Sequence, residues 1–217
     1  FSCIYRIRDE IIQLLNERGI RFVELSPDEP FVFSALERKI KYRKREGHHY
    51  GYGWCGGKCR WATTYKLQAI QRFKLSLNDD VTDYVGIAAD EPKRFEKAKC
   101  EGKVLPLVQW GMTEDDCLQY CRDHGFSWQE RSPITTSGVV DLYDILDRVS
   151  CWCCANKNLK ELRNIYQYLP QYWQQLKDMQ VKIERPFKGF YKGTPVGIFE
   201  LERRFESEVR DENQSNT

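Results

Sequence analysis

Five of the nine cysteines in this 217-residue chain fall in two short windows. Cys55 and Cys59 occupy the first window, and Cys151, Cys153 and Cys154 occupy the second. Paired thiolates separated by a long insertion are typical of tetrahedral metal sites and iron–sulfur clusters, because each short loop turns two ligands toward one point. The spacing therefore predicts a soft-metal site. The alternative is that cysteines pack as small hydrophobic side chains, which suits the remaining four better. Those four are Cys3, Cys100, Cys117 and Cys121.

Two groups of charged side chains are candidates for binding a phosphate or sulfate. Arg60 and Lys66 flank the predicted start of a helix, where exposed backbone amides add to the attraction for an anion. Asp90, Glu91 and Arg94 come just after an apolar run that predicts a buried strand. Open α/β sheets bind their ligands beyond the carboxyl ends of such strands. A polar loop that merely turns toward a helix is the alternative for this second group.

A basic tract follows a predicted helix over residues 31–40. It is either a solvated helix end or an electropositive surface that binds a phosphate-bearing ligand or a nucleic acid. Nearby tyrosines and histidines would offer stacking surfaces in the second case. The cations of residues 38–45 are Arg38, Lys39, Lys41, Arg43, Lys44 and Arg45.

The elements that must position these groups alternate between helix and strand. Helical spacing of apolar residues over 5–18 precedes a short predicted strand over 21–25, and apolar runs at 83–88 and 104–108 predict two more strands. This alternation predicts an α/β fold with a parallel sheet. Residues 126–140 show no periodicity and predict a loop over a site.

The chain divides into three parts by these patterns. Residues 1–150 form the predicted α/β domain, and residues 151–199 hold the second cysteine window and a helical portion. Residues 200–217 are charged and predict a disordered tail. No apolar run approaches the ~20 residues of a membrane-spanning helix, so no membrane partner is expected. Nine cysteines without a signal peptide indicate a reducing cytoplasm, and the net charge of +2 predicts no strong partner by itself.

Several of these motifs occur in the order of one known family. The chain resembles the phosphoadenosine-phosphosulfate (PAPS) reductase family, within the adenine-nucleotide α-hydrolase-like superfamily that includes the pyrophosphatase-loop ATP enzymes. The segments that carry the resemblance span about half the chain. They are Arg60 to Lys66, Gly86 to Glu91 with Arg94, Pro106 to Trp110, and Leu142 to Cys151 with Cys154.

The resemblance implies a Rossmann-like parallel sheet flanked by helices, with an adenine nucleotide such as ATP or PAPS at the carboxyl ends of its strands. It implies phosphate or sulfate contacts for Arg60, Lys66 and Arg94. Asp90 and Glu91 would line the same pocket as catalytic residues and orient the substrate or a cation such as magnesium.

The resemblance also implies a cofactor. Some relatives hold a [4Fe-4S] cluster between an early cysteine pair and a late one. Cys55 and Cys59 are similar to the early pair, and Cys151 and Cys154 to the late pair, with Cys153 as the alternative to Cys151. Zinc is the alternative metal, because four thiolates suit both.

Three departures from the family qualify this interpretation. The serine- and glycine-rich phosphate loop does not occur, and the chain begins at Phe1 without a methionine, so we expect the first strand, loop and helix to lie upstream. Ala62 stands where relatives often have a cysteine. No cysteine follows Cys154, whereas sulfonucleotide reductases attack sulfur with a C-terminal one, so reduction would need a thiol or sulfur donor protein.

The predicted function is that of a cytoplasmic PAPS-reductase-like enzyme, active in sulfonucleotide reduction, sulfur transfer or ATP α-phosphate chemistry. One alternative is a relative that thiolates or adenylates nucleic acid, with the basic tract over 38–45 as its binding surface. The other is a non-catalytic scaffold that a metal staples together.

Overall fold

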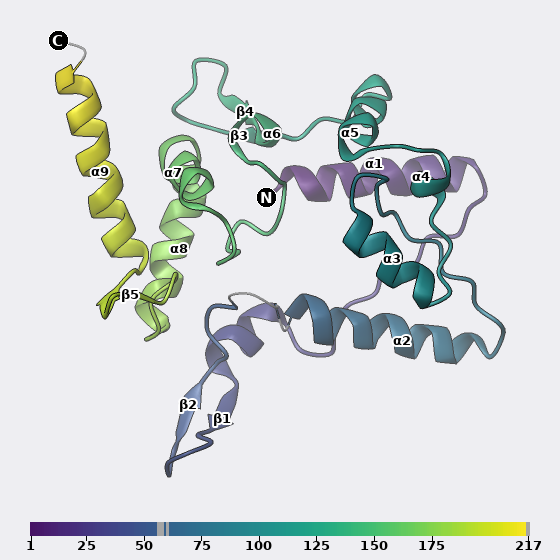
Figure 1. The fold of residues 1–217 in the computed structure, drawn as a ribbon, viewed down its shortest axis with the longest axis horizontal. Coiled ribbons are helices and arrows are strands. Elements are labelled where there is room, and N and C mark those ends of the chain that lie inside the picture. The colour runs from purple at the N-terminus through teal and green to yellow at the C-terminus, as the bar shows by residue number, and fades with distance from the viewer. Residues whose placement is uncertain (56–58, 60, 216–217) are drawn as a thin grey trace.

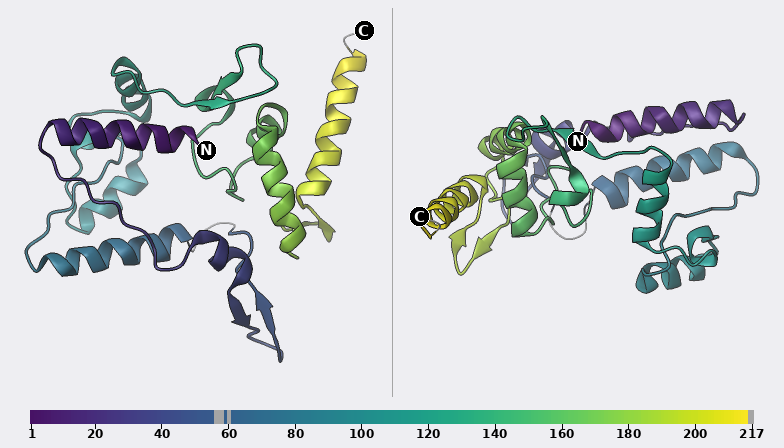
Figure 2. Two further views of the ribbon diagram at one scale, coloured as in Figure 1. Left: turned by 180° about the vertical axis from the view of Figure 1, so that it is seen from behind. Right: turned by 90° about the horizontal axis from the view of Figure 1, so that it is seen from above.

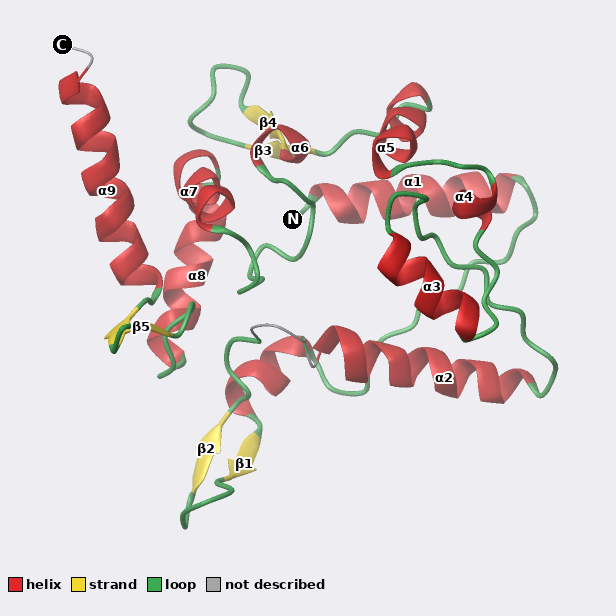
Figure 3. Ribbon diagram, viewed as in Figure 1, coloured by secondary structure: helices red, strands yellow, loops and turns green. Residues whose placement is uncertain are grey.

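Helices dominate the protein. The computed structural model describes residues 1–55, 59 and 61–215 and is about 49% helical. The strands in these residues form three separate two-stranded antiparallel sheets, β1–β2, β3–β4 and β5–β6 (Figures 1 and 3). The predicted Rossmann-like parallel sheet is therefore wrong.

The elements have the following bounds. The α-helices are α1 (Cys3–Glu17), α2 (Lys66–Leu77), α3 (Pro92–Cys100), α4 (Pro106–Gln109), α5 (Glu114–Asp123), α6 (Leu142–Ile145), α7 (Leu159–Tyr168), α8 (Pro170–Lys182) and α9 (Ile198–Ser215). Two short π-helices are η1 (Phe33–Glu37) and η2 (Trp61–Tyr65). The strands are β1 (Lys39–Lys41), β2 (His48–Tyr50), β3 (Gln129–Arg131), β4 (Val139–Asp141), β5 (Phe190–Tyr191) and β6 (Thr194–Pro195).

Among the residues that the structure describes, one isolated parallel bridge marks the place where the parallel sheet was expected. Tyr84 pairs with Val104 on either side of α3, and the Val104 amide donates to the Asp83 carbonyl at 2.8 Å. The pairing stops there for two reasons. The Ile87 amide donates to the carbonyl of Val85 in its own segment, and Pro106, which has no N–H, begins α4. The two segments thus flank a helix in the expected order, but they do not form a continuous ladder of backbone hydrogen bonds.

The main core lies among the C-terminal helices. Leu162 and Ile165 of α7, Leu176 of α8 and Ile198 of α9 are fully buried in one cluster. Local signals in the sequence place these helices correctly. Asn158 caps α7 in a reciprocal capping box, and a proline opens α8.

Residues 200–215 of the predicted disordered tail belong to helix α9, and the last two residues of that tail lie outside the described part of the chain. Leu201 and Phe205 of this helix are 1% exposed, and the Phe205 ring lies 5.8 Å from the ring of Trp173 on α8. Arg204 and Glu208 add an ion pair one turn apart. The charged residues of this segment form the outer face of an amphipathic helix whose apolar face completes the core.

The basic tract adopts a hairpin rather than a helix end. The helix expected over 31–40 ends at Glu37, and β1 then pairs with β2 in an antiparallel hairpin. Residues 21–25, expected as a strand, form none, while the loop expected over 126–140 contains the β3–β4 hairpin. No helix in the described part of the chain is both long and apolar enough to cross a membrane.

Candidate ligand-binding site

The two cysteine windows do not assemble a metal centre. Within residues 1–55, 59 and 61–215, no three histidine, cysteine, aspartate or glutamate side chains are grouped so that they could hold a metal ion. The predicted [4Fe-4S] cluster and its zinc alternative are therefore wrong, and these residues contain no three-ligand group that could hold magnesium either. The alternative function, a non-catalytic scaffold held together by a metal, is therefore unsupported as well.

Tryptophans, rather than thiols, bring both cysteine windows to the core. The Trp54 ring packs edge-on against Phe187 with centroids 4.7 Å apart, and the Trp152 ring lies 5.8 Å from that of Tyr172. Cys151 is exposed. These ring contacts account for how each window packs without any need for a shared metal.

Cys153 belongs to the core, and its burial has a consequence for stability at high pH. Burial raises the pKa of its thiol to about 12 from a usual value of 9.0. Above pH 9 the unfolded thiol loses its proton while the folded one keeps it, so the free energy of unfolding should fall as pH rises, by at most about 1.4 kcal/mol per pH unit from this group. We expect Cys153→Ala to flatten this slope in denaturant titrations between pH 9 and 11. Replacing the exposed Cys100 by alanine is the control, and an equal effect of both changes would contradict the assignment.

A cavity of about 410 Å³ lies where residues 86–94 meet α5 and the end of α6. Its walls come from segments that are far apart in the sequence. They are Gly86, Ala88, Glu91, Arg94, Leu107, Glu114, Asp115, Cys117, Leu118, Cys121, Trp128, Tyr143, Asp147 and Arg148.

The start of α5 is fixed firmly beside this cavity. Thr113 and Asp116 form a reciprocal capping box, as their spacing predicts. Asp90 Oδ1 accepts a hydrogen bond from the Glu114 amide at 3.1 Å, and the Ala89 amide donates to the Met112 carbonyl at 2.8 Å. Asp90, predicted to be catalytic, therefore positions α5 and is not among the residues that line the cavity.

The charges around the cavity are mixed. Glu91 accepts a hydrogen bond from Arg94 Nη1, with Oε2 at 2.5 Å. This bond is the main reason that the pKa of Glu91 lies below its usual value, and the charge of Arg148 contributes further. Arg148 forms no ion pair within the described part of the chain, so its guanidinium is available to a ligand. Four carboxylates and two guanidiniums line the cavity in total, which suits a ligand with few negative charges.

Two aromatic side chains form one wall of the cavity. The rings of Trp128 and Tyr143 meet edge to face, with centroids 5.2 Å apart. The Leu142 amide donates to the Trp128 carbonyl at 3.1 Å, beside the β3–β4 hairpin. Burial, with a smaller contribution from the charge of Glu114, raises the pKa of Tyr143, so its hydroxyl stays protonated as a hydrogen-bond donor.

Cys117 and Cys121 lie one turn apart on α5 and form an apolar part of the wall. Burial raises the pKa of both thiols, and for Cys117 the nearby charges of Cys121 and Asp116 raise it further. They are therefore thiols and not reactive thiolates at neutral pH.

Of the five residues predicted to act on phosphate or to be catalytic, Glu91 and Arg94 line the cavity. Lys66 begins α2, is exposed and does not line it, and Arg60 lies outside the described residues. Arg148, Trp128 and Tyr143 had no assigned role. For Tyr143 and Arg148 the only signal in the sequence was their place in the segment Leu142 to Cys151. Trp128 lies in the region that was expected to be a loop.

Comparison with known proteins gives no match to a family model, to a curated protein or to a solved structure. The arrangement of side chains in the cavity is the basis for the function below.

Proposed function

We propose that this cavity binds an adenine nucleotide with a short anionic tail, of the adenylyl sulfate type. The main support for the proposal is that three of the segments that carry the sequence resemblance contribute residues to one cavity. Glu91 and Arg94 come from the first, Leu107 from the second, and Tyr143 and Arg148 from the third.

The side chains in the cavity match the parts of such a ligand. Trp128 and Tyr143 offer aromatic surface to the adenine ring. The carboxylates accept hydrogen bonds from ribose hydroxyls and from the exocyclic amine. Arg148 pairs with the phosphate or sulfate, since a guanidinium binds such groups through two parallel hydrogen bonds. A longer tail, as in ATP, would place more negative charge beside four carboxylates and should bind less well.

Reduction of the bound sulfate group needs a thiolate from a partner protein, because the two thiols of the cavity are protonated. In this scheme the partner's thiolate attacks the sulfate sulfur, the bond from sulfur to the bridging phosphate oxygen breaks, and AMP leaves. The sulfonate is then attached to the partner's sulfur, and a second thiol of the partner releases sulfite as a disulfide forms. The chain itself binds and orients the nucleotide.

Arg148→Ala tests the binding site. We expect adenylyl sulfate to bind the parent protein in calorimetric titrations, with ATP weaker. A hydrogen-bonded charge pair contributes about 1.5–3 kcal/mol, so Arg148→Ala should weaken adenylyl sulfate binding by about 10- to 100-fold.

The matched control is Arg131→Ala. Arg131 is an exposed arginine of β3 that does not line the cavity, so its loss should leave affinity unchanged. Equal affinities for the parent and Arg148→Ala, or a folded parent that binds no adenine nucleotide, would refute the proposal.

A further inference from the structure

The β1–β2 hairpin extends away from the helical body as a separate arm (Figures 1 and 2). Its register pairs Lys39 with Tyr50, Ile40 with His49, and Lys41 with His48. Facing residues of an antiparallel pair share one face of the sheet. Lys39, Lys41, His48 and Tyr50 therefore lie on one face, and all four are exposed.

The arm carries a high density of unneutralised positive charge. Five of its residues are lysine or arginine, and one is acidic, Glu46. None of the five forms an ion pair with an acidic side chain within the described residues. They are Lys39, Lys41, Arg43, Lys44 and Arg45.

Arg38, which belongs to the same basic run, has a different role. Its Nη1 donates to Glu29 Oε2 at 2.5 Å and to the Tyr65 hydroxyl at 3.3 Å, and its guanidinium lies 5.9 Å from the centre of the Tyr52 ring. Arg38 thus ties the base of the arm to the body. The cations that form no ion pair within the described residues begin at Lys39.

Aromatic rings lie among these cations. The Arg45 guanidinium lies 3.8 Å from the centre of the Tyr42 ring, and the Tyr42 ring is 5.1 Å from the His49 ring. Tyr50 is 67% exposed. Cations beside exposed aromatic rings are the combination that binds a phosphodiester backbone and stacks on its bases.

The arm is held firmly at its base. The Gly51 amide donates to the Arg38 carbonyl at 2.8 Å, the Tyr52 amide to Ser34 at 3.0 Å, and the Gly53 amide to Ala35 at 2.9 Å. Ser34 and Ala35 are buried residues of η1. The charged face is therefore presented in a defined direction, which lowers the entropic cost of binding.

We propose that the hairpin Lys39–Tyr50 is a nucleic-acid-binding arm, in which lysine and arginine contact phosphates and tyrosine stacks on bases. A nucleic acid fits better than an anionic membrane, because the tip of the hairpin is Arg43, Lys44 and Arg45 and has no apolar side chain to enter lipid. This inference does not rest on the nucleotide cavity.

The test is binding of labelled DNA to the full chain, measured by fluorescence anisotropy with a short single strand and with its duplex. We expect binding of at least one of them that weakens as salt rises from about 50 to 200 mM. The triple change Arg43→Ala, Lys44→Ala, Arg45→Ala should weaken it about tenfold or more at low salt, and should reduce the salt slope by about 0.7–0.9 for each lost phosphate contact.

The control is a triple change with the same loss of charge on α9, Arg203→Ala, Arg204→Ala, Arg210→Ala. These arginines are exposed, and α9 lies away from the hairpin (Figure 1), so their loss should alter DNA binding little. Arg148→Ala should also leave it unchanged, which separates this proposal from the nucleotide site. Equal DNA binding by the hairpin triple variant and the parent, or binding to phosphatidylserine vesicles without binding to DNA, would overturn the proposal.

Discussion

Replacing Lys157 by methionine should lower the free energy of unfolding by about 3–5 kcal/mol, because it removes one partner of a buried ion pair and leaves the other charge behind. The Lys157 side chain is 1% exposed and that of its partner Glu161 is 8% exposed. Methionine is close to lysine in size, so the loss would come from charge rather than from a cavity. Urea titrations of the parent and the variant give the difference directly.

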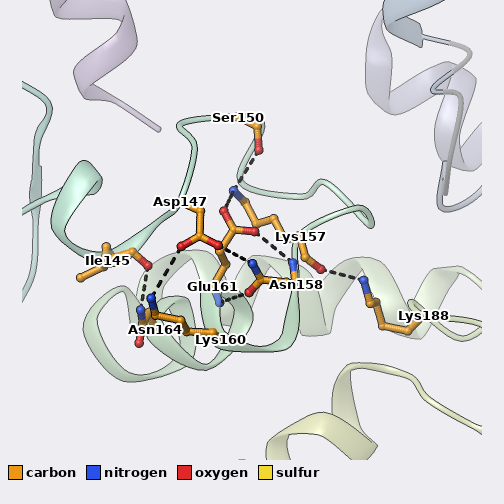
Figure 4. A network of polar contacts seen from close by, with 9 residues as sticks. All are labelled: Ile145, Asp147, Ser150, Lys157, Asn158, Lys160, Glu161, Asn164 and Lys188. Atoms are coloured by element: carbon orange, nitrogen blue, oxygen red, sulfur yellow. Dashed lines mark hydrogen bonds and ion pairs between the residues drawn. The ribbon is translucent and has the colours of Figure 1, made fainter. Parts of the chain in front are cut away.

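The contacts of Lys157 explain the size of this effect (Figure 4). Its Nζ donates to Ser150 Oγ at 2.9 Å and lies 3.9 Å from Glu161 Oε1. Glu161 Oε2 also accepts the Asn158 amide at 3.0 Å in the capping box of α7. The Lys157 carbonyl accepts a hydrogen bond from Lys188 Nζ at 2.7 Å. Burial lowers the pKa of Lys157, with the charge of Glu161 acting against this, so the ammonium depends on these partners.

Lys160→Met is the matched control for Lys157. Lys160 Nζ is 3.6 Å from Asp147 Oδ1, but both side chains are largely exposed. Such a pair contributes about 0–1 kcal/mol, so its loss should be small. Adding Glu161→Gln to Lys157→Met should recover part of the stability, because glutamine is neutral and can still complete the capping box. Equal losses for Lys157→Met and Lys160→Met would show that burial of the pair does not matter.

Local signals in the sequence predict the helices well. Thr113 and Asn158 cap the helices that follow them, as their spacing indicates. Pro170 begins α8, and Gly19, just after the first helix, adopts a positive φ, which glycine tolerates best. These features depend on residues within one turn of each other, so they can be read from the sequence.

Sheet formation depends on distant residues and could not be predicted in this way. The apolar run that includes Val85 and Ile87 predicts a strand, but its neighbour Pro106 lacks the amide that would extend the pairing. Leu201 and Phe205 are sparse among charged residues, and their role becomes clear only when α7 and α8 provide a core for them.

The sequence predicted only those residues of the candidate site that lie close together along the chain. Glu91 and Arg94 lie three residues apart, and a single segment places both at the cavity. Trp128 reaches the cavity from beside the β3–β4 hairpin, and Arg148 from beyond α6. For the cysteine windows, local spacing led to a wrong prediction. Their spacing suggested ligands, but Trp54 and Trp152 decide how these windows pack.

Gly51→Ala should detach the hairpin arm from η1. A Cβ atom at this position would lie 1.9 Å from the Ala35 carbonyl oxygen and 2.6 Å from the Leu36 Cα, so backbone would have to move. The φ angle of +66° adds the strain of a left-handed residue, about 1–2 kcal/mol. Loss of the three backbone bonds at the base of the arm, at about 1 kcal/mol each, brings the expected destabilisation of this segment to about 4–5 kcal/mol. Hydrogen exchange at the amides of residues 51–53 should therefore become much faster.

Gly19→Ala separates the steric effect from the conformational one. Gly19 has nearly the same φ, +67°, but no heavy atom lies within 4 Å of the position of an added Cβ. This variant should lose only the strain of the left-handed residue, about 1–2 kcal/mol, and should bind DNA as the parent does. Gly51→Ala should weaken DNA binding together with the faster exchange, because the cations of the arm would no longer be held in one direction. If the amides of residues 51–53 exchange at the parent's rate in Gly51→Ala, the close packing of the arm on η1 is wrong, and the arm must be bound to the body in some other way.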